Sequence, residues 1–209
     1  INAKGYCKIF EITGENVTLN RITFINGNAT GVNDSGSDNG GAICWKGANG
    51  AIYSSTFENN YALNGGAVFV DHDGQFGKID NSIFISNTAD FKGGAVDWNA
   101  SAGHVSGYKF INNTAGQNGG AVFVGASSGG SYILNSYFEG NNATGRGGAV
   151  DWYAASGDID NVTFIDNHAY LGGALFMGQV SANCTIFNSR FESNTAELYG
   201  GAIDCNATK

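Results

Sequence analysis

Aspartates and phenylalanines recur at one fixed place in this sequence, and they are the first candidates for chemistry. The place is the second residue after a repeated Gly-Gly-Ala phrase, and the residue type alternates along the chain: Phe69, Asp97, Phe123, Asp151, Phe176 and Asp204. Exposed aromatic rings separated by carboxylates can bind a sugar or another extended polymer. Carboxylates on either side of a sugar can also hydrolyse a glycosidic bond. Which chemistry is possible depends on the elements that hold these side chains.

Two phrases alternate along nearly the whole chain. Gly-Gly-Ala recurs every 25 to 28 residues, with its alanine at Ala42, Ala67, Ala95, Ala121, Ala149, Ala174 and Ala202. A Phe-x-x-Asn phrase lies between these copies and begins at Phe24, Phe57, Phe84, Phe110, Phe138, Phe164 and Phe191, with Gly27 replacing the Asn of the first copy. Self-similarity at such a period indicates a stacked repeat architecture.

The runs that join the phrases predict strands. They are short, β-branched or aromatic and alternate with period two, and Gly, Asn, Ser and Asp separate them. We therefore expect an all-β chain that forms a right-handed parallel β-helix of about seven coils, with two or three strands per coil. The predicted organisation is a single β-helix repeat domain over residues 1–209, a fragment of a longer protein, with an inserted loop at residues 30–39.

Stacking would place like residues above one another. We expect a ladder of side-chain amides at a bend, where Asn tolerates left-handed φ, from Asn60, Asn87, Asn113, Asn141, Asn167 and Asn194. A second, weaker column would hold Asn81, Asn135, Asn161 and Asn188. The phenylalanines of the repeat should stack inside, and the glycine pair should form a tight corner. Trp and smaller residues alternate at the third place after the alanine, because tryptophan in every coil would overfill the interior.

Period two places the first and third residues after the alanine inside and the second outside. The alternating phenylalanines and aspartates would then form an exposed binding strip on one face. A structural alternative is that loops cover the phenylalanines, and that spacing the aspartates two coils apart merely avoids stacking like charges.

Catalysis is the less favoured interpretation, so we expect a protein that is not an enzyme. Asp97 and Asp151 would lie two coils apart, roughly 10 Å, which is long for an acid–base pair. No basic residue stands beside the aspartate column by spacing, since Lys109 and Arg146 occur in different contexts. A polysaccharide lyase or hydrolase remains the enzymatic alternative.

Other candidate sites are weaker. The inserted loop could carry a specific contact through Asn33, Asp34 and Asp38, although its composition also suits a tolerated flexible loop. Asp71 and Asp73 could contribute to a calcium loop, but a solvated turn is the simpler interpretation. We expect no cofactor.

The cysteines and the glycosylation motifs do not decide between an oxidising and a reducing cellular compartment. Two disulfides or free thiols are both compatible with the four cysteines, Cys7, Cys44, Cys184 and Cys205. Nine Asn-x-Ser/Thr motifs allow a secreted glycoprotein, at Asn16, Asn28, Asn33, Asn99, Asn112, Asn142, Asn161, Asn183 and Asn206. The net charge of −8 argues against nucleic acid or an anionic membrane as partner, and no apolar run is long enough for membrane insertion.

The two phrases resemble the repeats of the chlamydial polymorphic membrane proteins. They are also similar to repeats in the adhesin-like surface proteins of methanogenic archaea, which the acidic, Asn-rich and Pro-free composition fits slightly better. The resemblance runs from about Phe24 to Ile203, and its motif residues match at Gly65, Gly66, Ala67, Val68, Phe84, Asn87 and their equivalents.

This resemblance implies an extracellular, cell-surface adhesin segment whose signal and anchor lie outside the fragment. Its partner would be a glycan or protein on a host or partner cell. The alternative is a passive stalk that displays a distal binding tip. A binder needs Phe69, Phe123 and Phe176 exposed, whereas a stalk does not.

Overall fold

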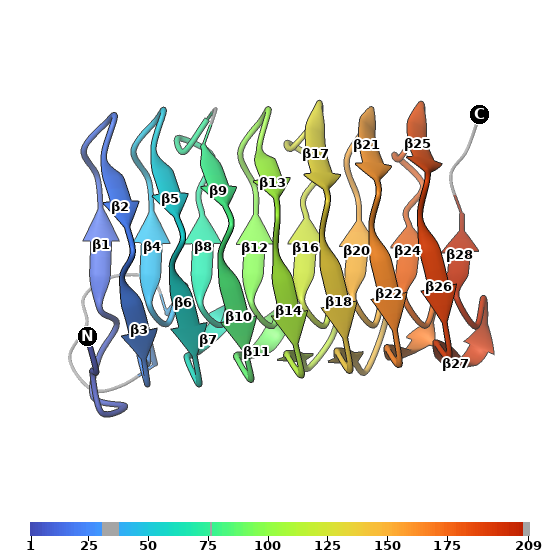
Figure 1. Ribbon diagram of the computed structural model, residues 1–209, viewed down its shortest axis with the longest axis horizontal. Helices are drawn as coiled ribbons and strands as arrows, with labels where there is room; N and C mark the ends of the chain where they lie inside the picture. The colour runs from blue at the N-terminus through green and yellow to red at the C-terminus, as the bar shows by residue number, and fades with distance from the viewer. Residues whose placement is uncertain (31–37, 76, 207–209) are drawn as a thin grey trace.

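Short parallel strands stack in register along the whole computed structural model, which describes residues 1–30, 38–75 and 77–206. The chain winds so that each coil lies on the one before it (Figure 1). Strands on the near face run downward, strands on the far face run upward, and the coils advance from left to right, so the turn is right-handed. The predicted parallel β-helix is confirmed, and no helix of the described residues is long and apolar enough to cross a membrane.

Four sheets make the walls. Sheet B contains β1 (Phe10–Ile12), β4 (Ile43–Trp45), β8 (Val68–Val70), β12 (Val96–Trp98), β16 (Val122–Val124), β20 (Val150–Trp152), β24 (Leu175–Met177) and β28 (Ile203–Cys205). Sheet C contains β2 (Thr18–Asn20), β5 (Ala51–Tyr53), β9 (Lys78–Asp80), β13 (His104–Ser106), β17 (Ser131–Leu134), β21 (Gly157–Asp160) and β25 (Cys184–Phe187).

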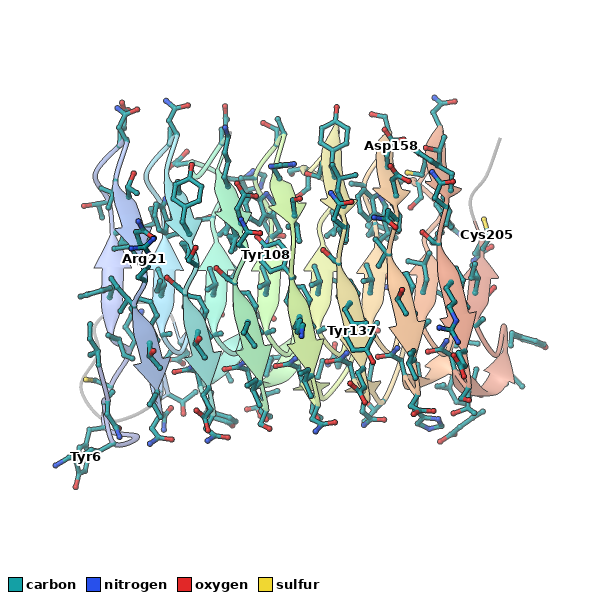
Figure 2. The ribbon with its side chains drawn as sticks, viewed as in Figure 1. Tyr6, Arg21, Tyr108, Tyr137, Asp158 and Cys205 are labelled. Carbon is teal, nitrogen blue, oxygen red and sulfur yellow. The ribbon has the colours of Figure 1, made fainter. Side chains whose placement is uncertain are left out.

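The other two sheets complete each coil. Sheet A contains β3 (Thr23–Ile25), β6 (Thr56–Glu58), β10 (Ile83–Ile85), β14 (Lys109–Ile111), β18 (Tyr137–Glu139), β22 (Thr163–Ile165) and β26 (Arg190–Glu192). Sheet D contains β7 (Tyr61–Asn64), β11 (Thr88–Lys92), β15 (Thr114–Ala115), β19 (Asn142–Ala143), β23 (His168–Leu171) and β27 (Thr195–Tyr199). Tyr137 and Asp158 project from the outer faces of sheets A and C (Figure 2).

A complete coil thus has four strands, in the order B, C, A and D, and the expectation of two or three was wrong. The physical reason is that one left-handed residue is enough to bend the chain between strands. Ser54, with φ of 49°, separates β5 from β6, and Asn59, with φ of 54°, separates β6 from β7. Such corners are shorter than the turns that sequence patterns reveal.

Phenylalanine rings fill the interior as predicted. Seven rings, from Phe24 to Phe191, stack face to face with centroid separations of 4.6 to 5.0 Å. Phe10 ends this stack at the N-terminal side with its edge toward Phe24, at 5.8 Å. Each ring from Phe24 to Phe164 is completely buried, so the column supplies a large share of the apolar burial that stabilises the fold.

The asparagine ladder is also confirmed. The Asn113 side chain donates to Asn141 Oδ1 (3.0 Å) and to the Phe84 carbonyl (3.1 Å). Its own Oδ1 accepts from the backbone N–H and side-chain amide of Asn87, both at 3.0 Å. The expected left-handed φ of these ladder residues was wrong, because left-handed residues precede them, as at Asn112. The second column is left-handed at the residues predicted for it, Asn81, Asn135, Asn161 and Asn188.

The two glycines of each pair are required at the tight corner for different reasons. Gly93 is left-handed, with φ of 61°, and a Cβ on Gly94 would lie 2.1 Å from the carbonyl oxygen of Gly120 in the next coil. The first glycine is required by conformation and the second by the close approach of backbones.

Tryptophans alternate with smaller residues on the inner side of sheet B. The Trp98 ring lies where a Cβ of Gly103 would be, only 2.2 Å from Cε2, and Trp98 Nε1 donates to the Ala100 carbonyl at 2.8 Å. Gly50 and Gly157 make the same room for Trp45 and Trp152. Each Trp ring and the glycine that makes room for it thus belong to the same coil. Val70 and Val124 stand at the equivalent place in the neighbouring coils, paired with Trp98.

All four cysteines lie among the described residues, and the structure holds them as thiols. The two disulfides that the sequence allows are therefore not formed in it. Cys44 is buried, whereas Cys7 and Cys205 are exposed.

Candidate functional site

The predicted Phe–Asp strip is in register on sheet B but is mostly buried. Asp97 pairs with Phe69 and Phe123 in neighbouring strands, and Asp151 pairs with Phe123 and Phe176. Exposure is 3% for Asp97, 5% for Phe123, 0% for Asp151 and 3% for Phe176. Phe69 and Asp204 are half-buried. The expectation of an exposed strip was therefore wrong for its four central members.

Side chains from the preceding corner cover this column. The residue just before each glycine pair belongs to a parallel ladder that continues sheet D, through Asn64, Lys92, Asn118, Arg146, Leu171 and Tyr199. Lys92 Nζ lies 4.6 Å from the centroid of the Phe123 ring. Arg146 Cζ lies 4.7 Å from the centroid of Phe176. A three-residue strand turns only its middle side chain outward, so one long side chain from the corner is enough to cover it.

Lys92 and Arg146 also interact electrostatically with the buried aspartates. Arg146 Nη2 lies 3.1 Å from Asp151 Oδ2, although neither carboxylate oxygen accepts a well-aligned hydrogen bond from a described residue. Asp97 accepts a hydrogen bond of 2.7 Å from the Asn99 side chain. Burial raises the pKa of both carboxyl groups to about 7, despite the opposing effects of Asn99 and Lys92 on Asp97 and of Arg146 and Lys92 on Asp151.

The statement that no basic residue lies beside the aspartates was wrong. Lys92 and Arg146 each precede their aspartate by five residues, in the runs KGGAVD and RGGAVD. The signal is present in the sequence, but it is visible only when the residue before the glycine pair is counted as part of the repeat. In the coils of Asp97 and Asp151 the residue before the glycine pair is basic, whereas in the coil of Asp204 it is Tyr199.

A hollow of about 430 Å³ lies at the C-terminal end of this covered column. Its lining residues are Arg146, Leu171, Phe176, Leu198, Tyr199, Asp204, Cys205 and Asn206, of which Cys205 is labelled in Figure 2. Tyr199 is 63% exposed and Leu198 is 50% exposed. Both belong to the last coil, in which Phe191 and Asn194 are also less buried than their equivalents in the coils before. The sequence pattern gave no indication of the hollow, because it depends on the order of the side chains across three successive coils.

The inserted loop is only partly described. Asn33 and Asp34, two of its three candidate contact residues, lie outside the described residues. Asp38 is exposed, and its carbonyl accepts a hydrogen bond of 2.8 Å from the N–H of Leu63. Asn39 already joins the ladder before the glycine pair by bridging to Asn64.

The weak calcium candidates lie in a turn. The Asp71 side chain accepts from the N–H of His72 at 2.7 Å, and its carbonyl accepts from Gly74 at 2.9 Å. Within residues 1–30, 38–75 and 77–206, no three His, Cys, Asp or Glu side chains gather closely enough to hold a metal ion. The geometry is that of a hydrogen-bonded turn.

One family model matches part of the chain, over residues 54–71. This stretch holds one Phe-x-x-Asn phrase and one Gly-Gly-Ala phrase, from the corner before β6 to the residue after β8. No curated protein and no solved structure matched the chain. Over these residues the chain is similar to the repeat described as the Chlamydia polymorphic membrane protein (Chlamydia_PMP) repeat.

Proposed function

We propose that this chain is a rigid structural segment of an extracellular, cell-surface protein. The observation that carries the proposal is the burial of Asp97, Phe123, Asp151 and Phe176 under Lys92 and Arg146. The residues that repeat most regularly are used to hold one coil on the next. A stalk needs such coupling between coils and does not need an exposed strip.

Further support comes from the ladders that run the length of the stack. Ring stacking, amide ladders and backbone pairing all link successive coils along the axis of the stack. The strands β1 and β28 lie at opposite ends of the stack (Figure 1), so the segment holds its first and last coils apart. The similarity to a membrane-protein repeat supports a place at the cell surface.

Adhesion is the second candidate, and the similarity to the Chlamydia polymorphic membrane protein repeat over residues 54–71 favours it. The partner would be a glycan or protein of a host or partner cell. The net charge of −8 disfavours nucleic acid and an anionic membrane. The archaeal source and the occupancy of the glycosylation motifs stay predictions.

We also propose that the segment is not an enzyme. Asp97 and Asp151, which the repeat stacks two strands apart in sheet B, are covered by cations and by neighbouring side chains. A hydrolase needs its two carboxyl groups facing one sugar.

The structural role can be tested with a distance measurement. The segment would be placed between two fluorescent protein domains, and energy transfer between them would be recorded in single molecules. We expect one narrow distance distribution, against a broad one for a Gly/Ser linker of equal residue count. A distribution as broad as that of the linker would contradict a rigid segment. Specific binding of the folded segment to a glycan array would favour the adhesin instead.

A further inference from the structure

Four half-buried isoleucines lie on the outer face of sheet A, and they are Ile83, Ile85, Ile111 and Ile165. Their strands, β10, β14 and β22, each pair with another strand on both sides, so the exposure of these side chains does not depend on either end of the stack. Basic side chains cover the outer column of sheet B, whereas these isoleucines stay partly accessible. A partly open apolar surface on a sheet is typical of a contact with another macromolecule.

The polar residues of this face stand in a fixed relation to one another. Where the third residue of a strand is a glutamate, the first residue carries a hydroxyl: Thr56 with Glu58 in β6, and Tyr137 with Glu139 in β18. Where the third residue is an isoleucine, as in β10, β14 and β22, the outer face of that strand carries no acid. The Tyr137 hydroxyl, which points outward (Figure 2), is within hydrogen-bonding reach of Glu139 in its own strand. Each acceptor on this face is thus matched by a donor one place across the strand.

This relation makes the face complementary to itself. If two copies meet face to face about a two-fold axis that runs along the stack, the order of the coils is kept and the direction of the strands is reversed. The first residue of each strand then faces the third residue of the same strand in the other copy. Glu58 would face Thr56 of the second copy, and Glu139 would face Tyr137 of the second copy. In β10, isoleucine would face isoleucine.

A two-fold axis across the stack gives a poorer match. It would place the third residues against one another, and from β6 to β22 these are only glutamate or isoleucine. Each glutamate would then face an apolar side chain or a second carboxylate, which costs free energy because the charge is left without a donor. With the axis along the stack, both copies rise by the same step of about 4.8 Å per coil, so matched residues stay together from coil to coil.

We propose that the outer face of sheet A joins two copies of this chain side by side, with their stacks parallel. The isoleucines of β10 and β14 would form the centre of the contact, between the glutamate–hydroxyl pairs of β6 and β18. The inference adds a lateral contact to the structural role and does not depend on it, because a rigid segment can act alone or in pairs.

Sedimentation equilibrium of the purified chain over a range of concentrations tests the pairing. We expect a monomer–dimer equilibrium that Ile85→Lys and, separately, Ile111→Lys weaken at least about tenfold, because a lysine would be buried in the contact. Both variants should fold, since the new lysine would lie beside Glu58 or Glu139 in the neighbouring strand of its own copy. Tyr132→Lys is the matched control, because it lies beside Asp158 on the outer face of sheet C and should leave the equilibrium unchanged.

Energy transfer between labelled copies tests the orientation and keeps the test valid if a lysine variant misfolds. Site-specific labels would be placed at the exposed Thr18 of β2 or Thr185 of β25, which lie six strands apart in sheet C, about 29 Å along the stack. We expect stronger transfer between Thr18 and Thr18 of two copies than between Thr18 and Thr185. A monomer at the highest soluble concentration, a dimer that both folded lysine variants retain, or stronger transfer between Thr18 and Thr185 would each overturn the proposal.

Discussion

Arg146 Nη2 lies 3.1 Å from Asp151 Oδ2 while the same guanidinium packs over the Phe176 ring of the next coil. One side chain thus contacts the carboxylate of its own coil and the aromatic ring of the following one. Lys92 packs over Phe123 in the same way, and it lowers the pKa of Asp97 against the larger effect of burial. In the central coils the alternation of Phe and Asp thus gives Arg146 one neighbour of each kind.

Removing a covered ring should destabilise the fold. Phe123→Ser should lower the free energy of unfolding by about 3 kcal/mol or more, because the change deletes a buried ring and leaves a hydroxyl in its place. Phe69→Ser, at a half-buried ring in the same column, should cost clearly less. Urea denaturation followed by circular dichroism measures both, and equal small losses would show that Phe123 is not buried.

The buried carboxyl groups make stability depend on pH. The pKa of Asp97 and that of Asp151 are raised to about 7 in the fold, whereas in the unfolded chain both groups titrate near 4. Stability is therefore highest below pH 4 with respect to these groups and is lost as pH rises through 7. We expect the free energy of unfolding at pH 8 to be lower than at pH 5 by on the order of 2–4 kcal/mol.

A neutral substitution isolates this effect. Asp97→Asn should reduce the dependence between pH 5 and pH 8 by about half, because the amide keeps the shape and does not ionise, while Asp151 still titrates. Asp90→Asn, at an exposed aspartate of sheet D, is the control and should leave the slope as it is. An unchanged slope in Asp97→Asn would mean that Asp97 ionises at its ordinary pKa.

The amide ladder should be as important as the ring stack. Asn113→Ala removes the side chain that bonds to Asn87, Asn141 and the Phe84 carbonyl, and it leaves buried polar groups without partners. We expect a loss of about 2–4 kcal/mol in the free energy of unfolding. Asn112→Gly is the control, because Asn112 is exposed and its φ of 53° suits glycine. Similar losses in both variants would contradict the ladder.

Adding one methyl group at a tryptophan corner should be poorly tolerated. In Gly103→Ala the new Cβ would lie 2.2 Å from Cε2 of Trp98, so the ring or the backbone must move. We expect a loss of at least about 2 kcal/mol. At Gly14 the nearest atom to a Cβ is a Val17 methyl at 3.5 Å, so Gly14→Ala should be close to neutral. Thermal denaturation compares the two, and a stable Gly103→Ala protein would place the Trp98 ring elsewhere.

The repeat made the columns predictable from the sequence. Phe84, Asn87 and Val96 each recur at matching places, so stacking alone assigns their neighbours, and the structure pairs Phe84 with Phe57 and Phe110. Period two likewise identified the outward direction of Asp97. These features depend only on which residues share a column.

Burial of the outward column could not be obtained from the same pattern. Period two tells which way the Asp97 and Phe123 side chains point, but not how far the Lys92 side chain reaches over them. The covering residue belongs to the corner and lies outside the strand whose pattern was considered. Four strands per coil were missed for a related reason, since single residues such as Ser54 and Asn59 bend the chain.

The most direct measurement of the central claim is hydroxyl radical footprinting of the unmodified protein, read by mass spectrometry. The rate of oxidation would be compared among Phe123, Phe176 and the exposed rings of Phe187 and Tyr199. We expect Phe123 and Phe176 to be protected at least tenfold, after correction for intrinsic reactivity, because Lys92 and Arg146 cover them. Oxidation of Phe123 and Phe176 at rates close to that of Phe187 would show an open strip and would contradict the structural role.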